Sequence, residues 1–147
     1  MIINLLPQAT FTDDELASFT TAQQQESANG YVSGYKLSGS KGTLSTYTAC
    51  TSGFIPVGIN DTVTIENIGL EMSSGNVNNI VFYNSNKELV YGVNGPSGGG
   101  AFDSGVTVSN GIYTFTPYTW AAGKNIAFFR ISCLTITTET SIKVTKA

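Results

Sequence analysis

The sequence contains no histidine, and only 12% of its 147 residues are charged. Histidine is the usual general base near neutral pH and the commonest metal ligand in proteins. Its absence excludes Ser-His-Asp and Cys-His catalysis, and zinc sites built on histidine, within this chain. We therefore expect a protein that is not an enzyme and that uses no metal or other cofactor.

Positive charge is also scarce, since seven Lys and Arg face ten Asp and Glu and the formal net charge is −3. Nucleic acids and anionic membranes attract proteins through a surplus of positive charge, so neither is an expected partner. The apolar stretch at residues 2–6 has no basic residue before it and is too short for a signal peptide or a membrane span. We expect no cleaved leader and no membrane insertion.

Only two cysteines are present, Cys50 and Cys133, which is too few for a disulfide scaffold. Both lie in apolar or β-branched patterns that predict strands, and two buried free thiols are the simpler interpretation. A disulfide between them requires Cα atoms within about 7 Å of each other. The sequence leaves both alternatives open.

Residues that favour turns and strands are abundant, with 16 Gly, 15 Ser, 19 Thr and 12 Asn. Strand-like runs alternate with Gly, Asn and Ser clusters at short spacing, as is typical of antiparallel sandwiches and barrels. We predict an all-β fold, an antiparallel two-sheet β-sandwich. Its ten strands are expected near residues 31–37, 43–51, 54–57, 62–68, 79–83, 88–93, 106–109, 112–116, 126–135 and 141–144.

Two hairpins are predicted from local patterns. Asn110-Gly111 separates two alternating runs, and an Asn-Gly pair adopts the positive φ angles of a two-residue turn at little cost. In that hairpin Val and aromatic side chains are expected to face each other across the strands. The polar residues 84–87 lie between two further apolar runs and predict the second hairpin.

The first 30 residues have a different pattern. Thr12 precedes three acidic residues that end at Glu15, which resembles a capping box at the start of a helix. Little further apolar surface follows Leu16 and Phe19, so a short helix and an extended docking arm both remain open for residues 12–28. We divide the chain into an N-terminal arm or docking segment, residues 1–30, and a β-sandwich domain, residues 31–147.

The only tryptophan, Trp120, follows Tyr118 in a segment that connects two predicted strands. A flat aromatic face can stack on a sugar ring, and Asn76, Asn78 and Asn79 are candidate partners for the sugar hydroxyls. Trp is strongly buried on average and is enriched at interfaces, so the simpler alternative is that Trp120 caps the core or lies in a subunit interface.

Arg130 is the only arginine, and it lies within a strand-like run. If Phe129 and Ile131 point inward, alternation directs Arg130 outward or into an interface, where a guanidinium is favoured when it is paired. A ligand contact and a purely structural anchor are both compatible with that position.

Carboxylates offer little support for catalysis. Glycoside hydrolysis needs a pair of them about 5–10 Å apart in a cleft, and the spacing along the chain indicates no such pair. Asp61 instead follows Gly58 in a turn that leads into a predicted strand. A glycosidase or depolymerase is therefore kept only as a third hypothesis, after the two binding functions given below.

Several segments together resemble small β-sandwich domains, jelly-roll-like in form, of tailed-phage virion proteins. The resemblance spans most of the chain, and its motifs are structural. The segments that carry it are Asn4-Leu5-Leu6-Pro7, Gly34-Tyr35-Lys36-Leu37-Ser38, Gly53-Phe54-Ile55-Pro56-Val57, Asn60-Asp61-Thr62-Val63, Val81-Phe82-Tyr83-Asn84-Ser85-Asn86-Lys87 and Phe128-Phe129-Arg130-Ile131.

The resemblance implies a non-enzymatic accessory protein on the surface of a phage particle, made in the host cytoplasm. Its partners would be capsid or appendage proteins, as for a decoration protein, a head fibre or a tail or baseplate adhesin, and homo-oligomers such as trimers are expected. The alternative is a carbohydrate-binding module of a phage adhesin, which would attach to a host surface glycan through the Trp120 region.

Overall fold

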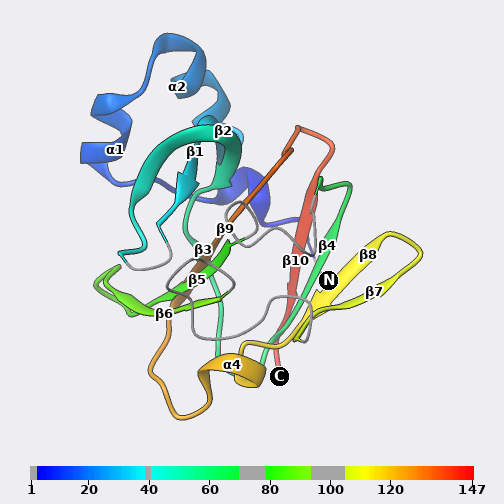
Figure 1. The fold of residues 1–147 in the computed structure, drawn as a ribbon. Coiled ribbons are helices and arrows are strands. Elements are labelled where there is room, and N and C mark those ends of the chain that lie inside the picture. The colour runs from blue at the N-terminus through cyan, green and yellow to red at the C-terminus, as the bar shows by residue number, and fades with distance from the viewer. Residues whose placement is uncertain (1–2, 39–40, 70–78, 94–104) are drawn as a thin grey trace.

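A computed structural model describes residues 3–38, 41–69, 79–93 and 105–147 and contains two packed antiparallel sheets with few helices (Figure 1). The strands are β1 (Tyr31–Leu37), β2 (Leu44–Ser52), β3 (Ile55–Pro56), β4 (Thr62–Glu66), β5 (Asn79–Tyr83), β6 (Leu89–Val93), β7 (Thr107–Ser109), β8 (Ile112–Phe115), β9 (Phe128–Cys133) and β10 (Ser141–Thr145). The helical segments are η1 (Leu6–Gln8), α1 (Asp13–Ser18), α2 (Thr21–Ser27) and α4 (Tyr118–Ala121). The predicted sandwich is confirmed, and each predicted strand has a counterpart at nearly the same place in the chain.

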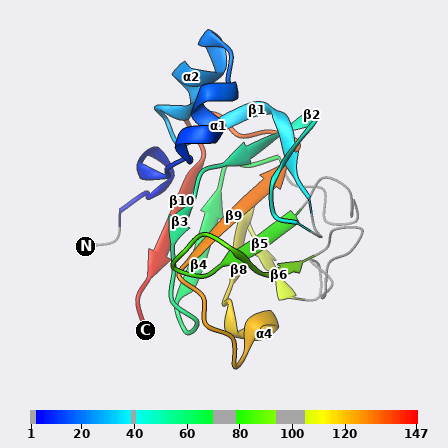
Figure 2. The ribbon, with the colours of Figure 1, turned by 90° about the vertical axis from the view of Figure 1, so that its left-hand side faces the viewer.

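The larger sheet has the strand order β1-β2-β9-β5-β6, and β3 also pairs with β9. The smaller sheet has the order β10-β4-β8-β7. The main core contains alternate residues of both sheets, among them Val63 and Ile65 of β4 and Phe129 and Ile131 of β9. Alternation in strands that face each other therefore builds the core, as expected for a sandwich. The pair α1–α2 lies at one end of the molecule and α4 at the opposite end (Figure 2).

Both predicted hairpins are present. Asn110 and Gly111 have φ angles of 54° and 77°, as a two-residue turn between β7 and β8 requires, and Val108 faces Tyr113 across the strands. The second hairpin joins β5 to β6, and Asn84 closes its turn by accepting hydrogen bonds from the backbone of residues 86 and 88 through its side chain.

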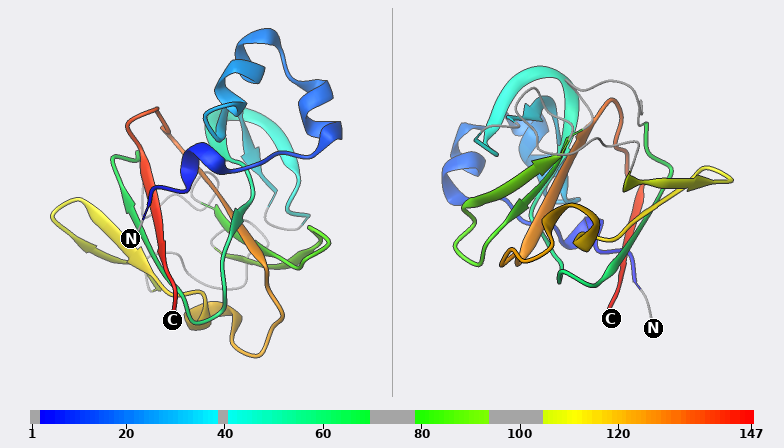
Figure 3. Two further views of the ribbon diagram at one scale, coloured as in Figure 1. Left: turned by 180° about the vertical axis from the view of Figure 1, so that it is seen from behind. Right: turned by 60° about the horizontal axis from the view of Figure 1, so that its bottom comes forward.

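The N-terminal segment is helical and is packed on the sandwich. Thr12 and Glu15 form the predicted capping box of α1, and a second capping box opens α2. Before these helices, Asn4 bridges to Lys143 of β10 and Thr10 bridges to Phe54 beside β3, so this stretch contacts both sheets. It crosses the back of the sandwich before it reaches α1 (Figure 3). Among the two alternatives for residues 12–28, the structure contains the helical one.

The turn before β4 forms around Asp61, as predicted. Its carboxylate accepts hydrogen bonds from the backbone N–H of Gly58 at 2.7 Å and from Lys146 at 3.0 Å. The backbone N–H of Ala147 adds a third at 3.1 Å. The side chain thereby ties the turn to the chain that follows β10.

This carboxylate predicts a loss of stability in acid. Burial raises the pKa of Asp61, but the hydrogen bonds from Gly58, Lys146 and Ala147 outweigh it and hold that pKa below its usual value. A lowered folded-state pKa gives stability that is complete above the unfolded pKa of about 4 and is lost as the pH falls through the lowered pKa. We expect Asp61→Asn to flatten the acid limb of the free energy of unfolding, measured by urea titration below about pH 4. An acid limb as steep as that of the wild type would contradict this role.

The two cysteines lie directly opposite each other, Cys50 in β2 and Cys133 in β9. Opposite Cα atoms in an antiparallel pair are about 4.5–5.5 Å apart, which lies within the range of disulfides. Both are free thiols, and burial raises the pKa of each. Both thiols are free as expected, but only Cys133 is buried and Cys50 is half-buried. Their register also places them where a disulfide could form.

Oxidation should consequently join these two strands within one chain. With glutathione disulfide as the oxidant, the two thiols are oxidised to the protein disulfide and two molecules of glutathione are released. We expect an intact mass lower by two hydrogen atoms and slow formation, because both pKa values are raised. Cys50→Ser is the control that cannot close the bond. A covalent dimer of wild-type chains would contradict the pairing of Cys50 with Cys133 within one chain.

Across the part of the chain that the structure describes, no helix is both long and apolar enough to cross a membrane.

Candidate functional site

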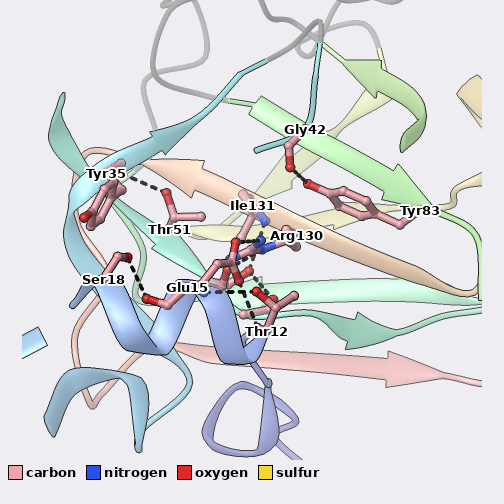
Figure 4. Close-up of polar contacts among 11 residues, drawn as sticks. Thr12, Glu15, Ser18, Tyr35, Gly42, Thr51, Tyr83, Arg130 and Ile131 are labelled. Carbon is pink, nitrogen blue, oxygen red and sulfur yellow. Dashed lines mark hydrogen bonds and ion pairs between the residues drawn. The ribbon is translucent and has the colours of Figure 1, made fainter. Parts of the chain in front are cut away.

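Arg130 lies in the middle of β9, between two core residues of the main cluster. Phe129 and Ile131 point into that core, so Arg130 projects from the other face of the larger sheet, as alternation predicts. The expectation that this face is open or intermolecular is wrong, because the Arg130 side chain is fully buried with 0% exposed. Helix α1 covers it, so the interface that it occupies lies within the chain (Figure 4).

Two of the three guanidinium nitrogens of Arg130 have partners. Nη1 forms an ion pair with Glu15 Oε2 at 2.7 Å, and Nε donates to the backbone carbonyl of Ser52 at 3.0 Å. Nη2 is buried and has no hydrogen-bond partner among the described residues. The side chain thus connects α1, β2 and β9, and its Nη2 group is left without a hydrogen-bond partner among the described residues.

Aromatic rings enclose the same guanidinium. Its carbon lies 4.3 Å from the centre of the Phe54 ring and 5.2 Å from that of Phe11. Cation–π contacts of this kind strengthen when the cation is removed from water. Phe11 also meets Phe19 edge to face, with ring centres 5.3 Å apart, in a small cluster beneath α1. The N-terminal segment is therefore held by apolar packing as well as by charge.

Glu15 is positioned by the start of α1. One carboxylate oxygen accepts from the backbone N–H of Thr12, and the Thr12 hydroxyl accepts from the backbone N–H of Glu15. This reciprocal capping box fixes the first turn, and the other oxygen is left to bind Arg130. The acidic residue that the sequence analysis assigned to a helix cap therefore has a second function in the tertiary structure.

A pocket of about 530 Å³ opens beside this ion pair. Its lining includes Arg130, Phe54 and Tyr83, together with the exposed side chains of Lys41 and Lys87. α1 lies on one side, the turn before β2 lies on another, and the β5–β6 turn completes the wall. The pocket combines cations, one ion-paired carboxylate and aromatic rings.

Tyr83 fixes one wall of the pocket. Its hydroxyl donates to the backbone carbonyl of Gly42, and its ring lies so close that a Cβ at Gly42 would come within 3.0 Å of it. Gly42 also has a φ of 69°, which disfavours other residues there. Burial raises the pKa of Tyr83 well above its usual value, so the hydroxyl stays neutral and serves as a donor.

Two acidic side chains line this pocket. The described residues contain no group of three or more Cys, Asp or Glu side chains placed to hold a metal ion. Asp14 and Glu15 are the two carboxylates of the pocket, but Glu15 is already occupied by Arg130 and by its helix cap. The arrangement suits the binding of a ligand with acceptor oxygens.

The other predicted site residues lie elsewhere. Trp120 in α4 is half-buried and packs against Phe82 and Phe115, with ring centres 6.3 and 5.5 Å away. This agrees with the alternative in which it caps the core. Tyr118 of the same helix is 56% exposed. Asn76 and Asn78 lie outside the described residues, and the backbone of Asn79 pairs with Ser132 at the start of β5.

The sequence analysis singled out Arg130 but missed the groups that meet it. Glu15 is 115 positions away in the chain, and Phe54 and Tyr83 were assigned only to strand motifs. One signal was present, because a lone arginine inside an apolar strand needs an anionic partner wherever it is buried.

Comparisons with models of protein families, with curated proteins and with solved structures found no match.

Proposed function

We propose that this protein is a non-enzymatic accessory protein of a tailed-phage particle, a capsid decoration or a component of a head fibre or appendage, which binds a capsid or appendage surface. The observation that carries the proposal is that three motifs of the phage resemblance become neighbours in the fold. Ile55 of β3 and Phe82 of β5 both pair with Phe129 of β9. Residues of three of the six resembling segments thus meet in one sheet.

The composition supports attachment through uncharged contacts. Only 12% of residues are charged, while Ser, Thr and Asn are abundant. The docking segment of residues 1–30 is part of the proposal, but only part of its surface is available for docking. Leu6, Phe11 and Phe19 are buried within the molecule, so a partner would contact the outer face of α1 and α2.

Immunogold electron microscopy of phage particles from the source organism tests this proposal, with an antibody raised against the purified chain. Gold over capsids is the result expected for a decoration or head-fibre protein, and gold at the tail would identify an appendage component. The matched control is the same antibody absorbed with the purified protein. Particles that carry no more gold than this control would contradict the proposal.

Homo-oligomerisation belongs to the same proposal, and light scattering during size exclusion measures it. We expect a mass that is a multiple of 15.5 kDa, with three chains as the expected number. A strictly monomeric protein that never purifies with particles would contradict it.

A second function, binding of a host surface glycan, is favoured by the pocket at Arg130. Its lining joins the half-buried Tyr35 and Leu44 to the exposed cations Lys41 and Lys87, while Phe54, Tyr83 and Arg130 lie buried behind them. Ligand sites commonly have this combination of an apolar lining and a few placed polar groups. Trp120, by contrast, packs against core rings, so the glycan proposal now depends on the Arg130 pocket.

A further inference from the structure

One row of side chains crosses all four strands of the smaller sheet on the face that meets the core. In the order β10, β4, β8, β7 the row consists of Ile142, Ile65, Tyr113 and Val108, each paired with the next. Ile142 and Ile65 are buried in the main core, and Tyr113 packs against it. Val108, at the end of the row, is 47% exposed, on a hairpin that projects from the sandwich (Figure 3). The apolar face of this sheet therefore continues past the core.

The backbone groups at the two ends of the row differ. At the β10 end, Ile142 donates its N–H to the Asn4 side chain and accepts at its C=O from the backbone N–H of Leu5. Pairs along a row alternate between those that exchange hydrogen bonds and those that do not, so Val108 directs its N–H and C=O away from Tyr113. No residue in the described part of the chain hydrogen-bonds these two groups. The β10 edge is thus capped and the β7 edge is open.

The other two sheet edges carry protection against pairing with a further strand. At the β1 edge, the Ser33 N–H donates to the Glu26 carboxylate and the Ser33 C=O accepts from the Gln23 side chain. The β5–β6 pair has a register shift, and β6 begins directly after the charged Glu88. Caps, bulges and charges are the means by which native proteins blunt exposed edges. β7 lacks all three, because residues 104–116 contain no charged residue and its pairing with β8 is regular.

A second copy of β7 fits this edge because the strand is complementary to itself. Two β7 strands related by a twofold axis at Val108 lie antiparallel, and each Val108 then donates its N–H to the C=O of the other. Thr107 of one chain lies opposite Ser109 of the second copy, and hydroxyl side chains in such pairs stabilise neighbouring strands. Since residues 104–116 are uncharged, two copies meet here without charge repulsion.

We propose that two copies of this chain pair through β7, so that their four-stranded sheets join edge to edge in one continuous sheet. The pairing places the two Val108 side chains side by side, each with Tyr113 of its own chain on its other side, and covers the exposed end of the apolar row. The contact is short, so pairing depends on protein concentration. The inference does not rest on the phage proposal, and a three-chain assembly needs a further contact elsewhere on the chain.

Cross-linking through one introduced cysteine tests the pairing. Val108→Cys, combined with Cys50→Ser, places a thiol opposite its own copy with Cα atoms about 5.5 Å apart, within the range of a disulfide. With glutathione disulfide as the oxidant, we expect a covalent two-chain product on a non-reducing gel.

Thr107→Cys in the same background is the matched control, on the same exposed strand. Its thiol lies opposite Ser109 of the second copy, and its own copy is about 8 Å away, beyond disulfide range. We expect at least about fivefold less two-chain product from this control, because only chance collisions cross-link it.

Light scattering over a range of concentrations measures pairing without a covalent link. Val108→Lys should weaken the association at least about tenfold, because it sets two like charges side by side. Thr48→Lys adds the same charge at an exposed position of β2 in the larger sheet and should leave the association unchanged. Both variants replace exposed residues, so both should melt close to the wild-type temperature.

Three results would overturn the proposal. The first is no two-chain product from Val108→Cys. The second is an equal yield from Thr107→Cys, which would identify chance collisions as its source. The third is a Val108→Lys chain that associates as strongly as the wild type. A three-chain assembly without cross-linking through Val108→Cys would leave the oligomer proposed above standing and remove only the β7 contact. Particle labelling measures the virion proposal separately.

Discussion

Replacing Arg130 by alanine is expected to lower the free energy of unfolding by about 3–5 kcal/mol, the cost of removing one partner of a buried ion pair. The carboxylate of Glu15 would lose its cation, with only 17% of that side chain exposed, and the Ser52 carbonyl would lose a donor. Phe54 and Phe11 would also lose the group that they enclose. For a chain of this length the melting temperature should fall by about 2–4 °C per kcal/mol.

Thermal and urea unfolding measure this effect, and two variants control it. Lys124→Ala removes an exposed cation and should change stability by less than about 0.5 kcal/mol. The double variant Arg130→Met with Glu15→Gln removes both charges and should be more stable than Arg130→Met alone, because no unpaired charge remains. If Arg130→Ala were as stable as Lys124→Ala, the ion pair would have no structural role.

Replacing Trp120 by alanine is the second large effect, with an expected loss of about 3 kcal/mol in the free energy of unfolding. This is the lower end of the range for buried Trp and Phe truncations, because Trp120 is half-buried. Its ring packs against Phe82 and Phe115, and a Cβ at Gly105 would come within 2.1 Å of it, so the surroundings are tight.

Tyr118→Ala is the matched control, since Tyr118 lies in the same helix with 56% exposed. We expect a change below about 0.5 kcal/mol for it. A Trp120→Ala protein that melts like the wild type but loses glycan binding would contradict this account. That result would instead support the hypothesis that Trp120 stacks on a sugar ring.

The strands were predictable because their signals are local. Alternation in β4 and β9, and the Asn110-Gly111 turn, determine structure over a few residues, and the structure contains them where the sequence placed them. The largest difference between a predicted and an observed strand is at residues 126–135, where the strand β9 covers only Phe128–Cys133. The ends of a strand depend on which backbone groups find hydrogen-bond partners. The alternation of apolar residues along the chain does not show where those hydrogen bonds stop.

The site was only partly predictable. Alternation gave the correct face for Arg130, opposite Phe129 and Ile131, but it could not show what covers that face. The cover is α1, whose Glu15 lies 115 positions earlier in the chain. A capping box explained Glu15 locally, so nothing in its surroundings called for a second partner. Such long-range pairs depend on how the elements pack, so a buried arginine in a strand indicates that an anionic partner exists but not which residue it is.

The most direct test of the account is the solvent exchange of the Arg130 Nε–Hε proton, followed by NMR in the unliganded wild-type chain. Burial under α1 and the hydrogen bond to Ser52 predict a sharp signal that persists at neutral pH and exchanges slowly with water. Glu15→Ala, which breaks the ion pair with α1, should speed this exchange. A proton that exchanges as fast as that of a free arginine would contradict the central claim, because α1 would then not be held on β9 and the pocket would not exist.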